Sequence, residues 1–197
     1  MSLKLKIYIV IIIASAIALF IYLIPSLPSL SNMWWVIIFF LFISIFAEFI
    51  PVDLPVGGVI SIGFPIDFLL ILVYGPALAM LITAFSALIG ETIERERSWY
   101  KVIFNAAQYS LTAGIAGIVY QQAGGVVGAQ NIFRFIFPAT ICALTYCIIN
   151  ITLFILVVSF AQNVRIATIW RTSIKETVPS YIAEAPMGFL MAIVYTE

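Results

Sequence analysis

Two side-chain amides, Asn105 and Gln108, stand three residues apart near the start of a long apolar segment. Residues three apart lie on one face of a helix. Amides inside a membrane helix mark a face that packs against other helices or lines a cavity. We therefore expect Asn105 and Gln108 to contact a polar ligand. The alternative is a structural role, in which they hydrogen-bond each other and a third amide, Asn150, across helices.

Carboxylates are the other groups with chemical potential inside the apolar segments. Glu48 stands near the end of one apolar run, Asp67 opens the next, and Glu184 lies within the last one, beside Pro186. An ionisable group in a membrane segment is by default a functional hypothesis. The alternatives without a ligand are solvation at the interface for Glu48 and a favourable position at a helix N-terminus for Asp67. These three acids and the three amides are our ligand-binding candidates.

Residues typical of catalysis or metal binding are scarce in this chain. It has no histidine, which removes the commonest general base and metal ligand. The two cysteines, Cys142 and Cys147, are five apart and would face different sides of a helix. We find no phosphate-binding, dinucleotide-binding or nucleophile motif. We therefore expect no catalytic residue, no metal and no cofactor, and keep a membrane enzyme only as a third hypothesis.

The composition requires a lipid environment. Hydrophobic residues make up 64% of the chain and charged residues 9%, whereas soluble domains carry about 25% charged residues. The mean hydropathy is +1.19. The net charge is zero, so nothing indicates a nucleic-acid partner. The lipid bilayer is the partner that this composition predicts.

The pattern of apolar segments predicts an all-α polytopic bundle in a single membrane domain over residues 1–197. The expected spans, each close to the roughly 20 residues that cross a bilayer, are 7–24, 33–50, 67–90, 102–121, 132–160 and 179–195. Residues 51–66 are rich in proline and glycine, which indicates a re-entrant or interfacial segment, or else a surface loop with a small hairpin. Gly75-Pro76 should kink the third span or end a half-helix. Residues 162–178 read as a polar connector.

The span at 102–121 is expected to lie at the centre of the bundle. Small residues recur along it, and small residues let membrane helices approach closely. They are Ala106, Ala107, Ala113, Gly114, Ala116 and Gly117.

Positive charges give an expected orientation. With six spans, the loops at 91–101 and 162–178 fall on one side and carry most of the Lys and Arg residues. The positive-inside rule places these loops in the cytoplasm. Both ends of the chain would then lie outside, despite Lys4 and Lys6, and a further span beyond Glu197 would return the chain to the cytoplasm.

Several short motifs in this order resemble the N-terminal membrane-associated sensor region of bacterial signalling proteins. They are Glu48-Phe49-Ile50-Pro51-Val52, Gly57-Gly58-Val59-Ile60-Ser61-Ile62, Gly75-Pro76, Ile103-Phe104-Asn105-Ala106-Ala107-Gln108, Val119-Tyr120, Gly124-Gly125, Asn150, and Gly188 through Tyr195. Such regions are most often joined to an HD-GYP phosphodiesterase domain and sometimes to a GGDEF cyclase domain. The resemblance implies a sensory input module, cut before a cyclic-di-GMP enzyme whose catalytic residues are absent here.

The resemblance also implies a location and partners. We expect a multi-pass protein of the bacterial inner membrane that binds a small molecule and forms a homodimer through its signalling domain. The alternative function is transport, because a chain of this length with six spans is similar to the substrate-binding subunit of an energy-coupling-factor vitamin transporter.

Overall fold

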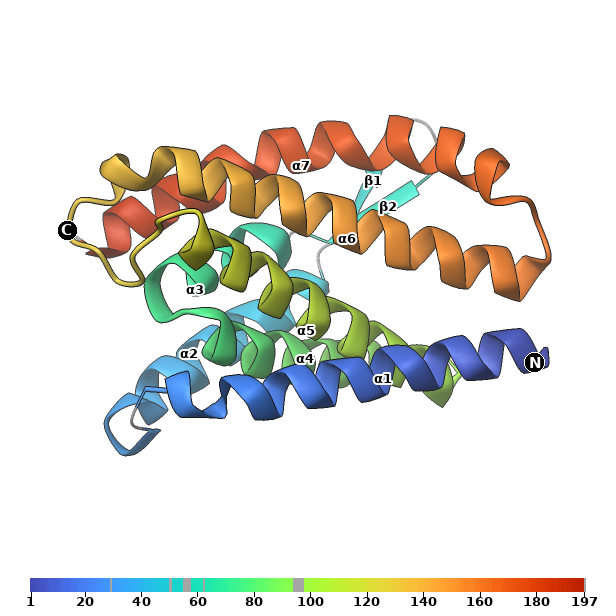
Figure 1. Ribbon diagram of the computed structural model, residues 1–197, viewed down its shortest axis with the longest axis horizontal. Helices are drawn as coiled ribbons and strands as arrows, with labels where there is room; N and C mark the ends of the chain where they lie inside the picture. The colour runs from blue at the N-terminus through green and yellow to red at the C-terminus, as the bar shows by residue number, and fades with distance from the viewer. Residues whose placement is uncertain (29, 50, 55–57, 62, 94–97, 197) are drawn as a thin grey trace.

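The computed structural model describes residues 1–28, 30–49, 51–54, 58–61, 63–93 and 98–196, and within these ranges it is a bundle of seven α-helices (Figure 1). The helices are α1 (Leu3–Leu23), α2 (Leu30–Glu48), α3 (Gly63–Tyr74), α4 (Pro76–Ile93), α5 (Trp99–Gln122), α6 (Ile136–Gln162) and α7 (Ile166–Thr196). Two 3₁₀ turns, Ile24–Ser26 and Ile132–Phe135, precede α2 and α6. The strands β1 (Pro51–Leu54) and β2 (Gly58–Ser61) form an antiparallel hairpin in which Pro51 pairs with Ser61.

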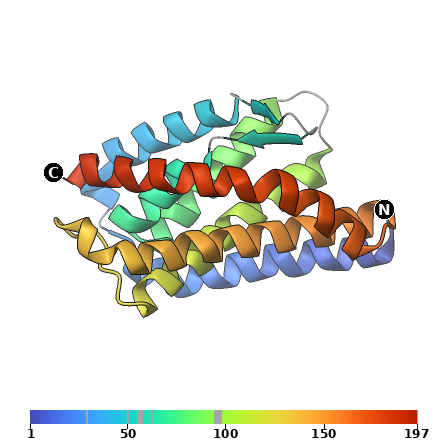
Figure 2. The same ribbon diagram turned by 90° about the horizontal axis from the view of Figure 1, so that it is seen from above.

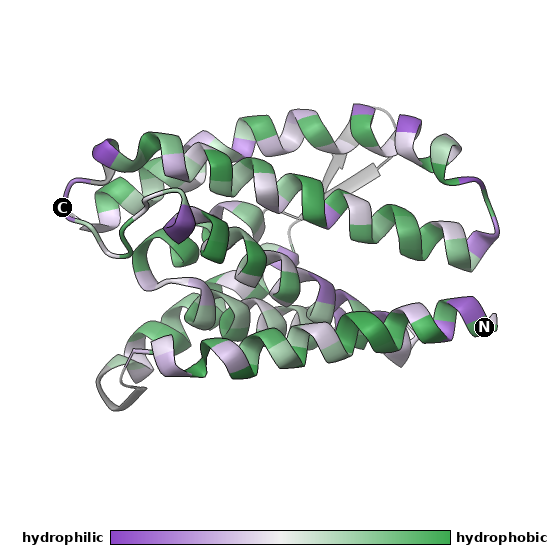
Figure 3. Ribbon diagram, in the orientation of Figure 1, coloured by the Kyte–Doolittle hydropathy of each residue, from purple (hydrophilic) through white to green (hydrophobic). Residues whose placement is uncertain are grey.

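The predicted all-α membrane bundle is confirmed. Five helical segments among the described residues are long and apolar enough to cross a membrane: Leu3–Ser26, Pro76–Ile93, Trp99–Gln122, Phe133–Gln162 and Thr177–Thr196. Two shorter apolar helices, Met33–Glu48 and Gly63–Tyr74, complete the bundle. Figure 3 shows long helices whose residues are mostly hydrophobic along their length. The chain is therefore a multi-pass membrane protein.

Helix α5 lies inside the bundle, as its small residues predicted. It contacts α1, α3, α4 and α6. A Cβ added at Gly117 would meet Pro76 Cβ at 2.7 Å, and one added at Gly114 would clash with Met80 Sδ. Glycine at these two positions therefore lets α4 pack closely along α5.

The predicted third span, 67–90, is two antiparallel helices, α3 and α4. Gly75 adopts the left-handed conformation with φ +86°, and its N–H donates to the carbonyl oxygens of Leu70 and Ile71. Only glycine adopts this conformation at little cost, and Pro76 then opens the next helix. Asp67 and Thr83 lie eight residues before and after Gly75, and their side chains hydrogen-bond each other. Gly75-Pro76 therefore ends a half-helix and reverses the chain.

This reversal corrects the expected orientation. One extra change of direction places the two ends of the chain at opposite ends of the bundle, as both ribbon views show (Figures 1 and 2). The expectation that both ends share one side is therefore wrong. The start of α1, the start of α5 and the start of α7 share one end of the bundle.

Two predicted boundaries also differ. Residues 162–178 were expected to be a connector, but α7 runs without interruption from Ile166 through the predicted sixth span, with Pro179 and Pro186 in its interior. The irregular segment extends only as far as the hairpin, since α3 already begins at Gly63. Pro65 is tolerated there because the first turn of a helix needs no N–H at that position. The small hairpin, the alternative reading of residues 51–66, is what the structure contains.

Candidate functional site

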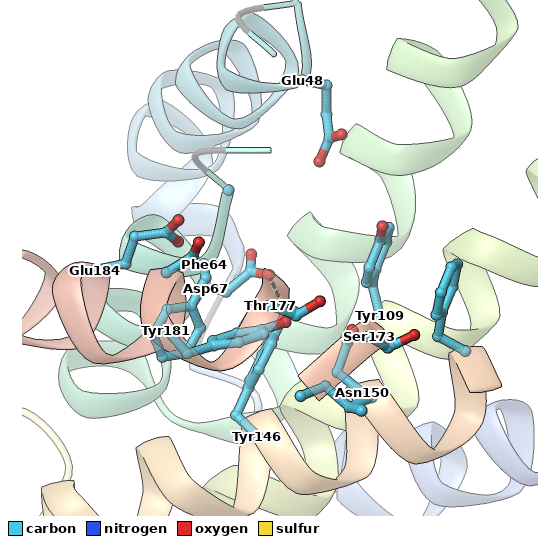
Figure 4. Close-up of a pocket in the computed structure, with 14 residues that line it drawn as sticks. Glu48, Phe64, Asp67, Tyr109, Tyr146, Asn150, Ser173, Thr177, Tyr181 and Glu184 are labelled. Carbon is cyan, nitrogen blue, oxygen red and sulfur yellow. Dashed lines mark hydrogen bonds between the residues drawn. The ribbon is translucent and has the colours of Figure 1, made fainter. Parts of the chain in front are cut away.

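A polar cavity of about 160 Å³ lies at the N-terminal end of α3 (Figure 4). With 12 residues, α3 is about 18 Å long, roughly half of the ~30 Å hydrocarbon core. The cavity is lined by residues of α2, α3, α5, α6 and α7. The lining residues are Glu48, Gly63, Phe64, Asp67, Tyr109, Tyr146, Asn150, Ile151, Phe154, Ser173, Thr177, Ser180, Tyr181 and Glu184.

Asp67 is the most enclosed acidic group of the cavity wall, with 6% of its surface exposed. The Tyr146 hydroxyl donates to its Oδ2 at 2.6 Å, and the Thr83 hydroxyl donates to its Oδ1 at 2.8 Å. Asp67 thereby joins α3 to α4 and α6. Both of these partners are neutral hydroxyls, so the two hydrogen bonds orient the carboxylate without supplying a positive charge.

Three aromatic rings form part of the same wall. The ring of Phe64 lies 4.8 Å from the ring of Tyr146 and 4.8 Å from that of Tyr181, measured between centroids. The Tyr146 and Tyr181 rings are 6.1 Å apart. These spacings are typical of tilted and edge-to-face aromatic pairs. The cluster gives the cavity a rigid aromatic side next to the Asp67 carboxylate.

Helix α7 contributes a polar face to the cavity. The lining residues of α7 are spaced by 4, 3, 1 and 3 positions, a pattern that keeps side chains on one face of a helix. They are Ser173, Thr177, Ser180, Tyr181 and Glu184. One turn beyond them, Gly188 brings α7 against α3, because an added Cβ would lie 2.8 Å from the carbonyl oxygen of Pro65. The close contact at Gly188 positions the polar face of α7 over the start of α3.

Two amides connect α5 with α6 beside the cavity. Gln108 is 3% exposed, and its Nε2 donates to the backbone oxygen of Asn150 at 3.4 Å. Asn150 is 7% exposed and lines the cavity. Gln108 Oε1 and Asn150 Nδ2 are buried without a hydrogen-bond partner among the described residues. Such groups are uncommon in folded proteins and call for a partner such as water or a ligand.

The sequence model of the MASE9 family matches residues 3–197. The chain belongs to the MASE9 family. MASE domains are membrane-associated sensor domains and are not catalytic, so membership in this family indicates a sensory role. No curated protein and no solved structure matches the chain.

The MASE9 structure brings four of the six predicted candidates together. Glu48, Asp67, Asn150 and Glu184 line the polar cavity. Asn105 does not line it. Its Nδ2 donates to Glu91 Oε1 at 2.6 Å, and it lines a second cavity together with Lys101. Gln108 is buried behind Asn150 and is not a lining residue. Asn105 and Gln108 thus have separate environments, and the ligand-binding role of all six residues stays a prediction.

Several lining residues of the MASE9 chain were missed from the sequence. Tyr146 and Tyr181 read as ordinary aromatic residues, since only the fold brings them to Asp67. The helical spacing of the hydroxyl-bearing residues of α7 could have identified them from the sequence. The prediction of a connector at 162–178 obscured this signal, because that range cuts the polar face in two. Within the described residues, no group of three or more His, Cys, Asp or Glu is arranged to hold a metal ion.

Proposed function

We propose that this chain is the membrane-embedded sensory input of a bacterial cyclic-di-GMP signalling protein, and that the polar cavity receives the signal. The observation that carries the proposal is the cavity itself, whose wall includes the two carboxyl groups of Asp67 and Glu184 inside an apolar bundle. Acidic groups at such positions are costly and mark ligand or ion sites. Membership in a family of membrane-associated sensor domains supports the same role.

Helix α7 is the element through which a bound signal would act. It supplies five of the lining residues and packs along α3 and α6. A ligand that prefers one position of α7 shifts the population of the protein toward that position. The regulated enzyme would be an HD-GYP phosphodiesterase or a GGDEF cyclase, and two copies would signal as a homodimer through that enzyme domain. No observation favours the vitamin-transport alternative.

Replacing Glu184 by glutamine tests this function in cells. The substitution keeps the size of the side chain and removes its charge from the cavity wall. We expect the cyclic-di-GMP level of cells carrying Glu184→Gln to differ from wild type by about fivefold or more, the lower range of ordinary coupling between sites. Mass spectrometry of nucleotide extracts measures this level.

The matched control is Ile182→Ala, two residues away on the same helix. Ile182 is 68% exposed and does not line the cavity, so cyclic-di-GMP should stay at the wild-type level. A wild-type level for Glu184→Gln, at equal protein abundance, would contradict the sensory role of the cavity.

We also propose that the end of the bundle at which α1 begins lies in the cytoplasm of a bacterium, with the bundle in its inner membrane. Among the described residues this end carries six Lys and Arg residues, whereas Arg134 lies at the other end. The six are Lys4, Lys6, Lys101, Arg165, Arg171 and Lys175. This distribution follows the positive-inside rule. Arg95 and Arg97, used for the orientation from sequence, lie outside the described residues.

Reporter fusions at the two ends of the chain test this orientation. Green fluorescent protein joined before Met1 should fluoresce, because that end is cytoplasmic. Alkaline phosphatase joined after Glu197 should be active, because α7 ends on the opposite side. A fusion before Met1 that does not fluoresce, or an inactive phosphatase after Glu197, would contradict this orientation. A cytoplasmic enzyme joined to the end of this chain would need one more crossing.

A further inference from the structure

We infer that the polar cavity binds a small methylated or quaternary ammonium ion. The inference rests on the proposed function, since it takes the cavity to be the site that receives the signal. It adds the chemical class of the ligand. The charge, the aromatic wall, an unsatisfied amide and the size of the cavity each contribute a separate argument.

The charge of the cavity favours a cation. Asp67 and Glu184 are lining residues, whereas no Lys or Arg occurs among the described lining residues. The hydrogen bonds of Asp67 come from two neutral hydroxyls. Glu184 has no hydrogen bond or ion pair among the described residues and lies on the α7 wall (Figure 4). Carboxylates withdrawn from water need a positive partner or additional donors. A cationic ligand supplies that partner.

The aromatic wall selects the kind of cation. Phe64, Tyr146 and Tyr181 all line the cavity, with centroids within 4.8 to 6.1 Å of one another. Aromatic faces attract cations through their quadrupole, and groups of such rings are suited to quaternary ammonium ions. A methylated ammonium has few or no N–H donors and loses little hydration on contact with the rings. A strongly hydrated metal cation would instead need several oxygen ligands.

Asn150 is the independent observation that points to a ligand. Its side chain is more than nine-tenths buried, lies on the cavity wall, and has an Nδ2 without a partner in the part of the chain that the structure describes. A side-chain amide donates two hydrogen bonds and accepts others. A rotation of the Asn150 amide toward the cavity would give this donor a polar substituent on the ligand as its partner, such as a hydroxyl or carbonyl group.

The size of the cavity limits the ligand. Its volume of about 160 Å³ is close to the ~150 Å³ of an engineered protein cavity that holds benzene. A ligand with a single ammonium centre and a short substituent fits this volume.

Calorimetric titration of the purified protein in detergent tests the inference with tetramethylammonium chloride as the probe. Tert-butanol is the matched neutral molecule, because it has nearly the same shape and no charge. We expect tetramethylammonium to bind at least about tenfold more tightly than tert-butanol, given the strength of a desolvated cation–π contact. Sodium chloride at the same concentration should give no binding signal.

Two variants separate the charge from the aromatic contribution. Glu184→Gln and Tyr181→Leu should each weaken tetramethylammonium binding about tenfold, the effect of losing one desolvated charged or cation–π contact. Lys175→Gln is the control. Lys175 is exposed on α7 outside the cavity, so its loss should leave the affinity unchanged. Circular dichroism before each titration shows that the variants retain their helices.

The outcomes distinguish this inference from the proposed function. Binding of tetramethylammonium that weakens in both variants supports the inference, even if cyclic-di-GMP does not respond to Glu184→Gln. No binding, equal binding of tert-butanol, equal binding of sodium, or wild-type affinity in Glu184→Gln overturns it. In these cases a cyclic-di-GMP response to Glu184→Gln would still leave the sensory role in place.

Discussion

Replacing Gly188 by leucine should push α7 away from α3 and dismantle the polar cavity. A Cβ at this position would lie 2.8 Å from the carbonyl oxygen and 2.9 Å from the Cα of Pro65, and 3.1 Å from Phe68 Cδ1. Two of these three atoms belong to the backbone, so no rotamer change relieves the clash. Overpacking of this kind costs about 1–3 kcal/mol and occasionally more. We expect Gly188→Leu to reach at least the upper end of this range.

The unfolding transition in detergent, followed by circular dichroism against increasing sodium dodecyl sulfate, measures this loss of stability. Ala183→Leu is the matched control, because Ala183 is exposed on another side of the same helix. The control should unfold at the wild-type detergent concentration. If Gly188→Leu and Ala183→Leu unfold alike, the close contact between α7 and α3 is not as the structure shows it.

Replacing Asp67 by alanine should remove the central polar junction of the bundle. The substitution leaves the hydroxyls of Tyr146 and Thr83 without their acceptor. An orphaned buried polar group costs about 1–3 kcal/mol. Thr83 can turn its hydroxyl to a backbone carbonyl one turn earlier in α4, whereas Tyr146 has no comparable backbone acceptor in its own helix. Removing the buried Asp67 carboxylate also removes the cost of its desolvation, which offsets part of the cost of the orphaned hydroxyls. We therefore expect the free energy of unfolding to fall by about 2–3 kcal/mol.

A double-mutant cycle between Asp67→Ala and Tyr146→Phe measures the hydrogen bond between these two residues. We expect a coupling free energy of about 1–3 kcal/mol, the usual range for residues in one network. Thr83→Val serves as the comparison and should lower the free energy of unfolding less than Tyr146→Phe does. Additive effects of Asp67→Ala and Tyr146→Phe would contradict the hydrogen bond that holds α3 to α6.

The sequence by itself determined the environment and the central helix of this protein. With 64% hydrophobic residues the chain cannot cover its apolar surface in water, so the membrane follows from composition, and the all-α bundle follows from the length of the apolar segments. The small residues of α5 predicted its central place, because close helix packing in lipid depends on small side chains. The acids Asp67 and Glu184 were identifiable as candidates because they lie at or within apolar segments. Unneeded charge is rare at such depth.

The tertiary structure alone decided how the chain turns and which polar groups meet. A Gly-Pro pair is locally compatible with a kink or with a reversal. The reversal at Gly75 is stabilised by contacts between residues distant in sequence, such as Asp67 with Thr83 and Gly117 with Pro76. That single choice set the opposite positions of the two chain ends. In the same way, the sequence predicted that a connector ends just before Pro179, but α7 continues through this residue because packing on α3 and α6 supports the helix. Asn105 hydrogen-bonds to Glu91 on α4, whereas Gln108 hydrogen-bonds to Asn150 on α6, so the two amides have different environments. Contacts between residues distant in sequence fix these features, and local patterns carry no record of such contacts.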